Sequence, residues 1–370
     1  MTQKMTRHMN GLTQAISRRR LLSGAAGATG AAAAGALLPR GAWAAGELNV
    51  LVWCDHADSK LLAPFEAAHN VKVNAKSYEG TGTALSILEQ SAPGDWDVLV
   101  IDAPDVPQVA DLGVLAELPK DIAPWGDIFP ELRNAPYTHV NGKSYAIPEK
   151  FGYYGFCYNK NVVDPADAKR GDIAWNEKYK GRIGVYDYYF PVLQMIGLSM
   201  GLKPSDITAD NLGGIRERLL AMKPNVKMVG DIVSVQNALV TGSVDVIVGG
   251  AEFAVSNLIP TNPHLDWTIS DDGGLIWNQG IGILSNSKRK ELATEFVKWI
   301  LSPKGQGLLA TSECFWAMPA NAKAELSAEA KGHLRWDDQP GFLANSQVSL
   351  LPDAELDAEM LDIWTEFLQS

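Results

Sequence analysis

The sequence predicts an α/β fold built on a parallel sheet, and two features of the chain indicate it. Short apolar runs alternate with segments of helical periodicity along most of the chain. The chain is also long enough: 370 residues, 46% hydrophobic and 20% charged, suffice for one large domain or two ordinary ones. This composition excludes a disordered chain, a coiled coil and a small disulfide-stapled domain.

The first block of expected elements follows the order strand, helix, strand, helix, strand. The expected strands are 47–53, 71–78 and 97–101, and the expected helices are 59–69, 83–91 and 105–112. In the first helix Leu61, Leu62, Phe65 and Ala68 recur at helical spacing. This order implies parallel strands joined by right-handed crossovers.

A second α/β block follows, and the chain then returns to the first. The expected elements are a strand at 183–186, helices at 192–202, 209–222 and 234–241, a strand at 244–248, a returning strand at 274–284, and helices at 290–301 and 353–368. The sequence shows no internal repeat and no low-complexity linker. Two lobes crossed more than once by the chain fit this pattern better than two independent domains in a row.

Residues 1–44 predict a twin-arginine signal peptide. The run Arg18–Arg20 precedes the apolar stretch Leu21–Leu38, and Ala42 and Ala44 supply the small residues that a signal peptidase requires. The alternative is a membrane-spanning helix, for which 18 residues are the minimum. Residues 1–44 hold six basic residues and no acidic one. Residues 45–370 therefore carry 26 basic and 43 acidic residues, a net charge of −17.

The charge of the whole chain is −11, which disfavours nucleic-acid binding because that needs a basic surface. Several enzymatic motifs are also missing from the sequence. There is no HExxH, no GxGxxG after a strand, and no metal-ligand spacing among the six histidines. We therefore expect no catalytic residues, no metal and no cofactor.

Seven segments of the chain, taken in order, form a pattern: ELNVLVWCDH (47–56), YEGTGTALSIL (78–88), DWDVLVIDAPDVPQV (95–109), AIPEKFGYYGFCYNK (146–160), PVLQMIGLSMGL (191–202), GGLIWNQGIGIL (273–284) and EFVKWILSPKGQGLLA (295–310). In this order they resemble periplasmic solute-binding proteins of the spermidine/putrescine-binding type, which feed ABC importers. The resemblance spans about residues 47–320. It implies a two-lobed periplasmic binding protein fold with a hinge and an interlobe ligand cleft that closes on the solute.

The resemblance also implies a division of the chain. The expected parts are the signal peptide 1–44, a first lobe of 45–155 plus 274–320, a second lobe of 156–273, and a C-terminal helical segment 321–370 that packs on the lobes. The hinge is expected near 151–158 and 270–275.

Polyamine-binding members use aromatic walls and several carboxylates, because each desolvated ammonium needs a carboxylate or an aromatic face. Four residues of this sequence match the aromatic positions: Trp53, His56, Trp277 and Trp316. The acidic positions match less well. They fall on Gln279, Tyr188 and Pro191, and a further Trp position falls on Val248. The expected replacement charges are Asp55, Asp102, Asp187 and Glu252.

Further candidates lie in the same segments. The Gly80–Thr83 loop opens a helix, so Thr81, Thr83 and the free N–H groups could hold a polar or anionic ligand, or form only a capped helix start. Five tyrosines form either an aromatic cage or a packed interlobe floor: Tyr153, Tyr154, Tyr186, Tyr188 and Tyr189. Lys150 is expected to be solvated rather than paired with a ligand acid.

The three cysteines are too few for a disulfide framework. Cys54, Cys157 and Cys314 are dispersed, and we expect them to be buried as small apolar residues. Alternatively, Cys54 and Cys157 lie near the cleft, where periplasmic oxidation would matter.

The sequence thus predicts the periplasmic substrate-binding subunit of an ABC importer. It would act as a monomer, bind a small organic amine of the polyamine class and deliver it to an ABC permease in the inner membrane. The alternative within the same scaffold is a zwitterionic or anionic solute, such as an amino acid derivative, an opine-like compound or an aminophosphonate. A periplasmic enzyme is the remaining, less favoured alternative.

Overall fold

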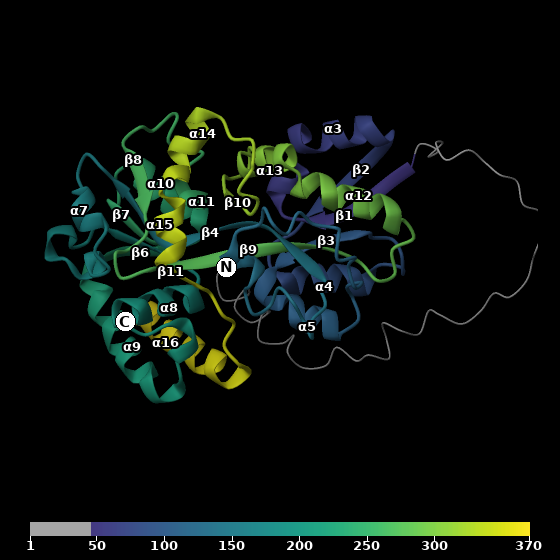
Figure 1. Cartoon of the computed structure of the whole chain (residues 1–370). Coiled ribbons are helices and arrows are strands. Elements are labelled where there is room, and N and C mark those ends of the chain that lie inside the picture. Colours follow the sequence, from purple (N-terminus) through teal and green to yellow (C-terminus); the bar gives the residue numbers. More distant parts are fainter. Residues whose placement is uncertain (1–45) are drawn as a thin grey trace, which may run out of the picture.

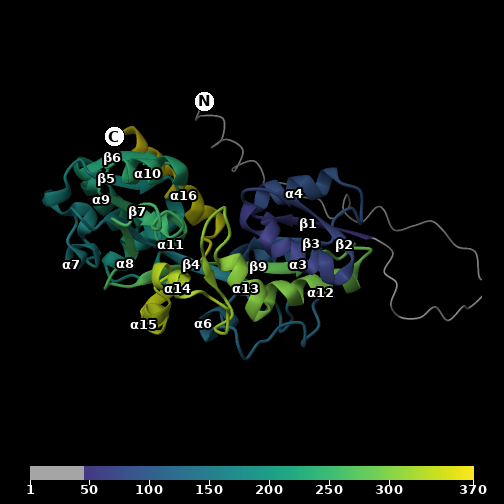
Figure 2. The same ribbon diagram turned by 90° about the horizontal axis from the view of Figure 1, so that it is seen from above.

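The computed structural model describes residues 46–370, which form two lobes lying side by side (Figure 1). The α/β, two-lobed prediction is confirmed. The view from above shows the same two groups of elements with β4 and β9 running between them (Figure 2). The expected signal peptide, 1–44, lies outside the described residues. Within residues 46–370 no helix is long and apolar enough to cross a membrane.

A single path of hydrogen-bonded strands runs through both lobes in the order β2-β1-β3-β9-β4-β7-β5-β6. The strands are β1 (Gly46–Val52), β2 (Val71–Ser77), β3 (Val98–Asp102), β4 (Ala146–Asn159), β5 (Ile183–Tyr186), β6 (Val226–Gly230), β7 (Val246–Gly250), β8 (Leu265–Thr268), β9 (Gly274–Ile283), β10 (Met318–Pro319) and β11 (Ser346–Val348). Off this path, β8 and β10 pair with β4, and β11 pairs with β9.

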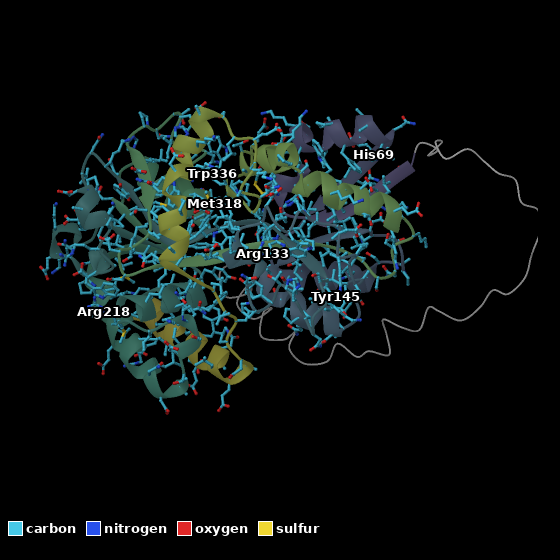
Figure 3. The ribbon with its side chains drawn as sticks, viewed as in Figure 1. His69, Arg133, Tyr145, Arg218, Met318 and Trp336 are labelled. Atoms are coloured by element: carbon cyan, nitrogen blue, oxygen red, sulfur yellow. A yellow bond between two sulfur atoms is a disulfide. The ribbon has the colours of Figure 1, made fainter. Side chains whose placement is uncertain are left out.

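Helices cover the sheet in both lobes. They are α3 (Ser59–His69), α4 (Thr81–Gln90), α5 (Val106–Asp111), α6 (Pro130–Arg133), α7 (Pro165–Ala168), α8 (Tyr189–Ser199), α9 (Ala209–Met222), α10 (Ile232–Val240), α11 (Glu252–Val255), α12 (Lys290–Leu301), α13 (Pro303–Ala310), α14 (Ala328–His333), α15 (Gln339–Ala344) and α16 (Ala354–Gln369). Side chains help to locate the lobes: His69 and Tyr145 lie in the first, and Arg218 in the second (Figure 3).

The first lobe is built as its sequence predicts. Strands β2 and β3 both pair with β1 in parallel, and β9 pairs with β3 in the antiparallel direction. Helix α3 begins at Asp58, whose side chain accepts a hydrogen bond from the Lys60 N–H, and it ends at Asn70 in the left-handed conformation. The apolar face of α3 is buried because Leu61, Leu62 and Phe65 pack into the core.

In the second lobe β5 pairs in parallel with both β6 and β7. The C-terminal helix α16 packs on this lobe, where Trp364 and Phe367 join the buried cluster of α8 and α9. Its start is capped by Asp353, whose side chain accepts from the N–H groups of Glu355 and Leu356.

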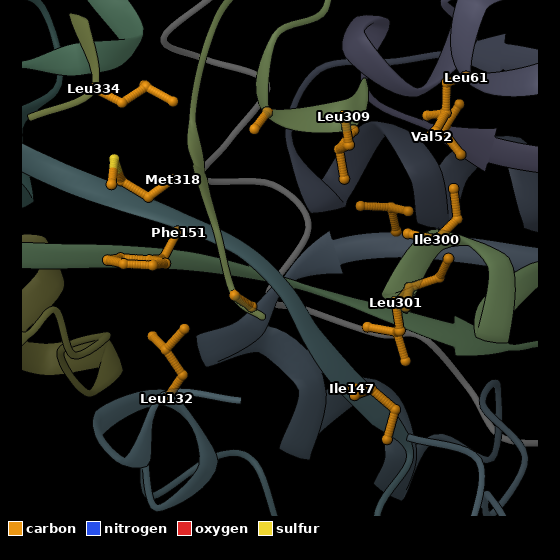
Figure 4. Packing of buried hydrophobic residues seen from close by; sticks show 14 of the residues in the cluster. Val52, Leu61, Leu132, Ile147, Phe151, Ile300, Leu301, Leu309, Met318 and Leu334 are labelled. Carbon is orange, nitrogen blue, oxygen red and sulfur yellow. The ribbon is translucent and has the colours of Figure 1, made fainter. Parts of the chain in front are cut away.

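The long strand β4 joins the two lobes. Its residues 146–154 pair with β9, residues 155–158 pair with β7 and residues 156–159 pair with β8, with a register shift in the β7 pairing between Gly155 and Phe156. The segment expected as a chain crossing is therefore a strand of 14 residues. One cluster of buried side chains around β4 includes Ile247 and Trp267 of the second lobe. Figure 4 shows part of the same cluster, with Val52, Leu61 and Ile300 among its residues.

Candidate functional site

The first lobe brings three strand ends together at one edge of its sheet. Trp53 follows β1, Tyr78 follows β2, and Asp102 is the last residue of β3. The carboxyl ends of parallel strands are where α/β sheets bind ligands. The ring centroids of Trp53 and Tyr78 lie 6.0 Å apart, and Thr81, three residues after Tyr78, is the first residue of α4.

The second lobe contributes the ends of its own parallel strands. Tyr186 is the last residue of β5 and Tyr188 comes two residues later, while Glu252 and Phe253 come shortly after β7. The ring centroids of Tyr186 and Tyr188 are 5.8 Å apart, and those of Tyr186 and Phe253 are 6.2 Å apart.

Two connecting strands link these groups. The ring of Tyr154 on β4 lies 6.1 Å from Tyr188, and the ring of Trp277 on β9 lies 5.9 Å from Phe253. The resulting aromatic cluster consists of Tyr154, Tyr186, Tyr188, Phe253 and Trp277. It joins first-lobe and second-lobe residues, and edge-to-face ring pairs of this kind present both ring faces and ring edges to a neighbour.

Glu252 lies against this cluster with no part of it exposed to solvent. Its carboxylate accepts the N–H of Tyr153 at 3.1 and 3.2 Å. A side chain at Gly152 would meet Glu252 Oε1 at 1.5 Å and Trp277 Cζ2 at 2.6 Å, so only glycine fits there. Burial raises the pKa of the Glu252 carboxyl well above its usual value, despite hydrogen bonds from backbone N–H groups.

Asp102 is the second carboxyl of the site. Burial, together with repulsion from nearby Asp105, raises the pKa of Asp102 to about 6. The Nε2 group of Gln279 donates to Asp102 Oδ1 at 3.0 Å, which opposes this rise. Burial also raises the pKa of Asp105. Two neighbouring carboxyls therefore share a poorly solvated position in the first lobe.

Several buried polar atoms around these carboxyls have no hydrogen-bond partner within residues 46–370. They are Trp53 Nε1, Thr81 Oγ1, Trp277 Nε1 and Gln279 Oε1. Buried polar groups in proteins are normally satisfied, so a group of such atoms on facing elements is typical of a ligand site. The arrangement offers carboxylates and aromatic faces to a cation, and N–H and O–H donors to an acceptor.

Seven of the expected residues belong to this arrangement. They are Trp53, Thr81, Asp102, Tyr188, Glu252, Trp277 and Gln279. Tyr154 from the same tyrosine pair faces the aromatic cluster, whereas Tyr153 points into the core, where its hydroxyl donates to Gln339 Oε1 at 2.7 Å. Alternation along β4 separates these two neighbours.

The other expected residues are not part of this arrangement. Asp187 is exposed and accepts from Trp364 Nε1 of α16 at 2.8 Å. Trp316 lies 5.8 Å from His333, ring to ring. Thr83 is exposed in the first turn of α4. Two surface hollows, along α16 and between α8 and 350–353, are lined by none of the expected residues.

Asp55 and His56 lie in a buried ion network with Glu149 and Lys150, and none of the four is exposed. His56 Nδ1 lies 2.9 Å from Asp55 Oδ1, and His56 Nε2 lies 3.2 Å from Glu149 Oε2, close enough for an ion pair although the angle does not suit a hydrogen bond. Lys150 pairs with the other Asp55 oxygen, and its ammonium lies 4.7 Å from the Phe315 ring centroid. The expectation of a solvated Lys150 was wrong, because residues distant in sequence cover it.

The cysteine expectation was also wrong for two of the three residues. Cys54 and Cys314 form a disulfide across a sequence separation of 260, and both are exposed. Cys157 is buried, as expected, and its thiol is free.

Sequence reasoning missed three residues of the arrangement: Tyr78, Asp105 and Phe253. Tyr78 had a signal, since it ends the second strand of a βαβ unit. Phe253 follows Glu252 at the end of β7, but nothing in the local pattern distinguishes it from a core residue.

Comparison with known proteins agrees with this fold. The spermidine/putrescine-binding periplasmic protein of Escherichia coli K12 is 25% identical over 254 residues, covering 68% of this chain and 71% of that protein. The putrescine/agmatine-binding protein of Pseudomonas aeruginosa PAO1 is 23% identical over 287 residues, covering 73% and 78%. The crystal structure of the spermidine/putrescine substrate-binding protein PotD of Streptococcus pneumoniae superposes with a TM-score of 0.75 at 20% identity, covering 88% and 99%.

The family comparison covers most of the chain. Residues 60–340 match the model described as bacterial extracellular solute-binding protein. Because that match spans well over half of the 370 residues, the chain belongs to the bacterial extracellular solute-binding protein family.

Proposed function

We propose that this protein is the periplasmic solute-binding subunit of an ABC importer for a small organic amine of the polyamine class. The names of its curated relatives, which bind spermidine, putrescine or agmatine, support the ligand class. Family membership supports the role in import. The protein would act as a monomer and deliver its solute to a membrane permease.

One observation carries the proposal. Asp102 and Glu252 have poorly solvated carboxyls beside aromatic rings, and neither has a lysine or arginine ion-pair partner within residues 46–370. A buried carboxylate without a counter-charge is unfavourable. A positively charged ligand would therefore be stabilised by both Asp102 and Glu252. An ammonium beside Glu252 would also face the Trp277 ring.

Binding would bring the lobes together. In our proposal the first lobe is 45–155 plus 274–320, the second is 156–273, and the segment 321–370 packs on them. The hinge lies in 151–158 and 270–275, where β4 leaves β9 for β7 and where the chain returns into β9. A closed form presents one surface to the permease only when solute is present.

The alternative ligand is a zwitterionic or anionic solute. The donors at Trp53, Trp277 and Thr81 favour it, because unpartnered N–H and O–H groups suit a carboxylate or phosphonate oxygen. Gln279 also favours this alternative, because the polyamine binders have an acidic residue at the matching position. A periplasmic enzyme remains the less favoured possibility, tested by turnover of any bound solute.

A thermal-shift panel of putrescine, spermidine, agmatine, betaines, amino acids, opines and aminophosphonates tests the proposal. A ligand at a hundred times its Kd adds about 2.7 kcal/mol of stability. For a protein of this size that moves Tm by roughly 4 °C or more. Shifts with the di- and polyamines support the proposal. Shifts with zwitterions or anions alone would replace it with the alternative.

Export through the twin-arginine route is part of the proposal, and Arg18–Arg20 before an apolar stretch support it. Replacing Arg18 and Arg19 by lysine is expected to keep the protein out of the periplasm. Periplasmic fractions immunoblotted for wild type and variant give the answer. Undiminished export of the variant would argue for another route.

A further inference from the structure

The loop that follows Trp53 is fixed at three consecutive positions. The residues Cys54–Ala57 form a tight turn in which the N–H of His56 donates to the Trp53 carbonyl at 3.1 Å. Asp55 and His56 are held inside by the buried ion network, while Cys54 points outward into the disulfide. The backbone that carries the Trp53 indole therefore has one internal anchor and one external anchor.

The external anchor connects this loop to a distant segment. Cys314 lies between Glu313, whose N–H donates to Asp58 Oδ2 at 3.0 Å, and Phe315, whose ring faces the Lys150 ammonium. The Cα atoms of the two cysteines are 6.0 Å apart. Without the covalent bond, the remaining links on the outer side are one exposed hydrogen bond and an exposed ion pair between Lys60 and Glu313, which contribute little.

The two anchors differ in accessibility. The four members of the ion network are fully buried, whereas both cysteines of the disulfide are exposed. A small thiol can reach the disulfide and break it while the network stays intact, because exposed disulfides are the ones most open to exchange. Breaking it would free the residue next to Trp53 without unfolding the lobe.

We propose that the Cys54–Cys314 disulfide is a positioning element for Trp53 in the solute site, so that solute affinity depends on the oxidation state of this pair. The inference rests on the proposed function, in which Trp53 is one wall of the site. Reduction by dithiothreitol transfers two electrons and two protons to the disulfide and leaves two thiols, while the dithiol closes to its cyclic disulfide. An untethered Trp53 must then be immobilised when the solute binds.

The first test measures putrescine and spermidine affinity by calorimetry for the wild type, Cys314→Ser and the double Cys54→Ser/Cys314→Ser variant. Both variants are expected to bind about three- to tenfold more weakly, the cost of immobilising one side chain. Thermal unfolding of the same samples separates affinity from folding. Affinity unchanged from wild type in a folded variant would overturn the proposal.

A double-mutant cycle distinguishes positioning from general destabilisation. If the disulfide acts through Trp53, Cys314→Ser costs affinity in the wild type and almost none in a Trp53→Ala background. In a Trp277→Ala background its cost remains in full, which makes Trp277 the matched control. Equal losses in both backgrounds would contradict a role through Trp53.

A second readout does not need a ligand. In protein labelled with ¹⁵N-tryptophan, the Trp53 indole resonance is assigned by its loss in Trp53→Phe. It is expected to move or broaden on reduction and to return on reoxidation, while the Trp277 resonance stays. An unmoved Trp53 resonance would overturn the proposal. If the wild type binds neither amine, the proposed function fails, and this resonance still decides the positioning role.

Discussion

The Nε2 group of Gln279 donates to Asp102 Oδ1 at 3.0 Å, and the two residues stand opposite each other in the β3–β9 pair. The resemblance to polyamine binders places an acidic residue at position 279, where this chain has an amide. In the structure the carboxyl of Asp102, on the neighbouring strand, accepts a hydrogen bond from the Gln279 amide. We propose that Asp102 on β3 supplies, at the same level of the sheet, the negative charge that position 279 lacks.

Trp277 provides the first prediction. Trp277→Ala is expected to weaken putrescine or spermidine binding by about 1–3 kcal/mol, because a desolvated cation–π contact and apolar contact area are both lost. Calorimetric titration measures it. Trp96→Phe is the matched control, since Trp96 donates to Ser91 and precedes β3, at the opposite end of that strand from Asp102. A full-affinity Trp277→Ala protein would remove this ring from the site.

Glu252→Gln separates affinity from stability. The substitution keeps the shape and removes the charge, so amine affinity is expected to fall by about 1.5–3 kcal/mol, the worth of a hydrogen bond to a charged group. The stability of the free protein should change by less than about 1.5 kcal/mol, because the side-chain volume is conserved. Urea unfolding and calorimetry on the same samples measure both. Exposed Glu217→Gln serves as control, and equal affinities of the two variants would exclude Glu252 as the cation partner.

The affinity for amines should depend on pH through Asp102. Its pKa of about 6 in the free protein means that acidification through this range protonates the carboxyl and removes a partner of the ammonium. Affinity is therefore expected to fall as the pH drops below about 6. Titrations between about pH 5 and pH 8 measure it, and Asp102→Asn should lack this step. A pH-independent wild type would contradict the assignment.

The same linkage predicts proton release on binding. The pKa of Glu252 lies well above its usual value in the free protein, and a bound ammonium would favour the ionised form. Binding enthalpies at one pH in buffers of different ionisation enthalpy measure the number of protons released. Glu252→Gln should release fewer. Identical enthalpies in all buffers would exclude a titrating carboxyl at the site.

Local sequence patterns predicted the amphipathic elements well. The bounds of α3, α9 and α12 agree residue for residue with expectation, because their apolar spacing and end signals lie within the elements themselves. The strand β4 was not expected, since its residues are buried on both faces and show no alternation. Its pairing partners, β9 and β7, come more than 80 residues later.

Prediction of the site from sequence was limited in the same way. Residues at the ends of recognisable strands, such as Trp53 and Asp102, could be chosen from sequence because the carboxyl ends of parallel strands converge. The burial of Lys150 could not be predicted from sequence, because its partner Asp55 is 95 residues away and a charged side chain is normally solvated. The Cys54–Cys314 pair, 260 residues apart, has no local signal at all.

Lys150→Met tests the buried ion network. Removing one partner leaves Asp55 and Glu149 with one cation fewer inside the protein, and breaking a buried pair costs about 3–5 kcal/mol. Urea unfolding is expected to show a loss of this size. Lys143→Met is the matched control, because Lys143 forms an exposed ion pair with Glu117. Equal stabilities of the two variants would contradict the burial of Lys150.

His56 should make folding stability fall as the pH rises. Burial lowers the pKa of the His56 imidazole, but the carboxylates of Glu149 and Asp55 outweigh burial and raise it above 6.5. Because the folded-state pKa is above the unfolded value, the stabilisation is complete below pH 6.5 and is lost as the pH rises through the folded pKa.

The free energy of unfolding, measured by urea titration between about pH 6 and pH 9, should decline by at most about 1.4 kcal/mol per pH unit from this group. The raised pKa values of Asp102 and Glu252 act in the same direction, so the difference between wild type and His56→Gln isolates the histidine. That difference should shrink as the pH rises, because the wild type alone loses a proton-dependent ion pair. A difference that does not shrink over this range would mean that the pKa of His56 is not raised in the folded protein.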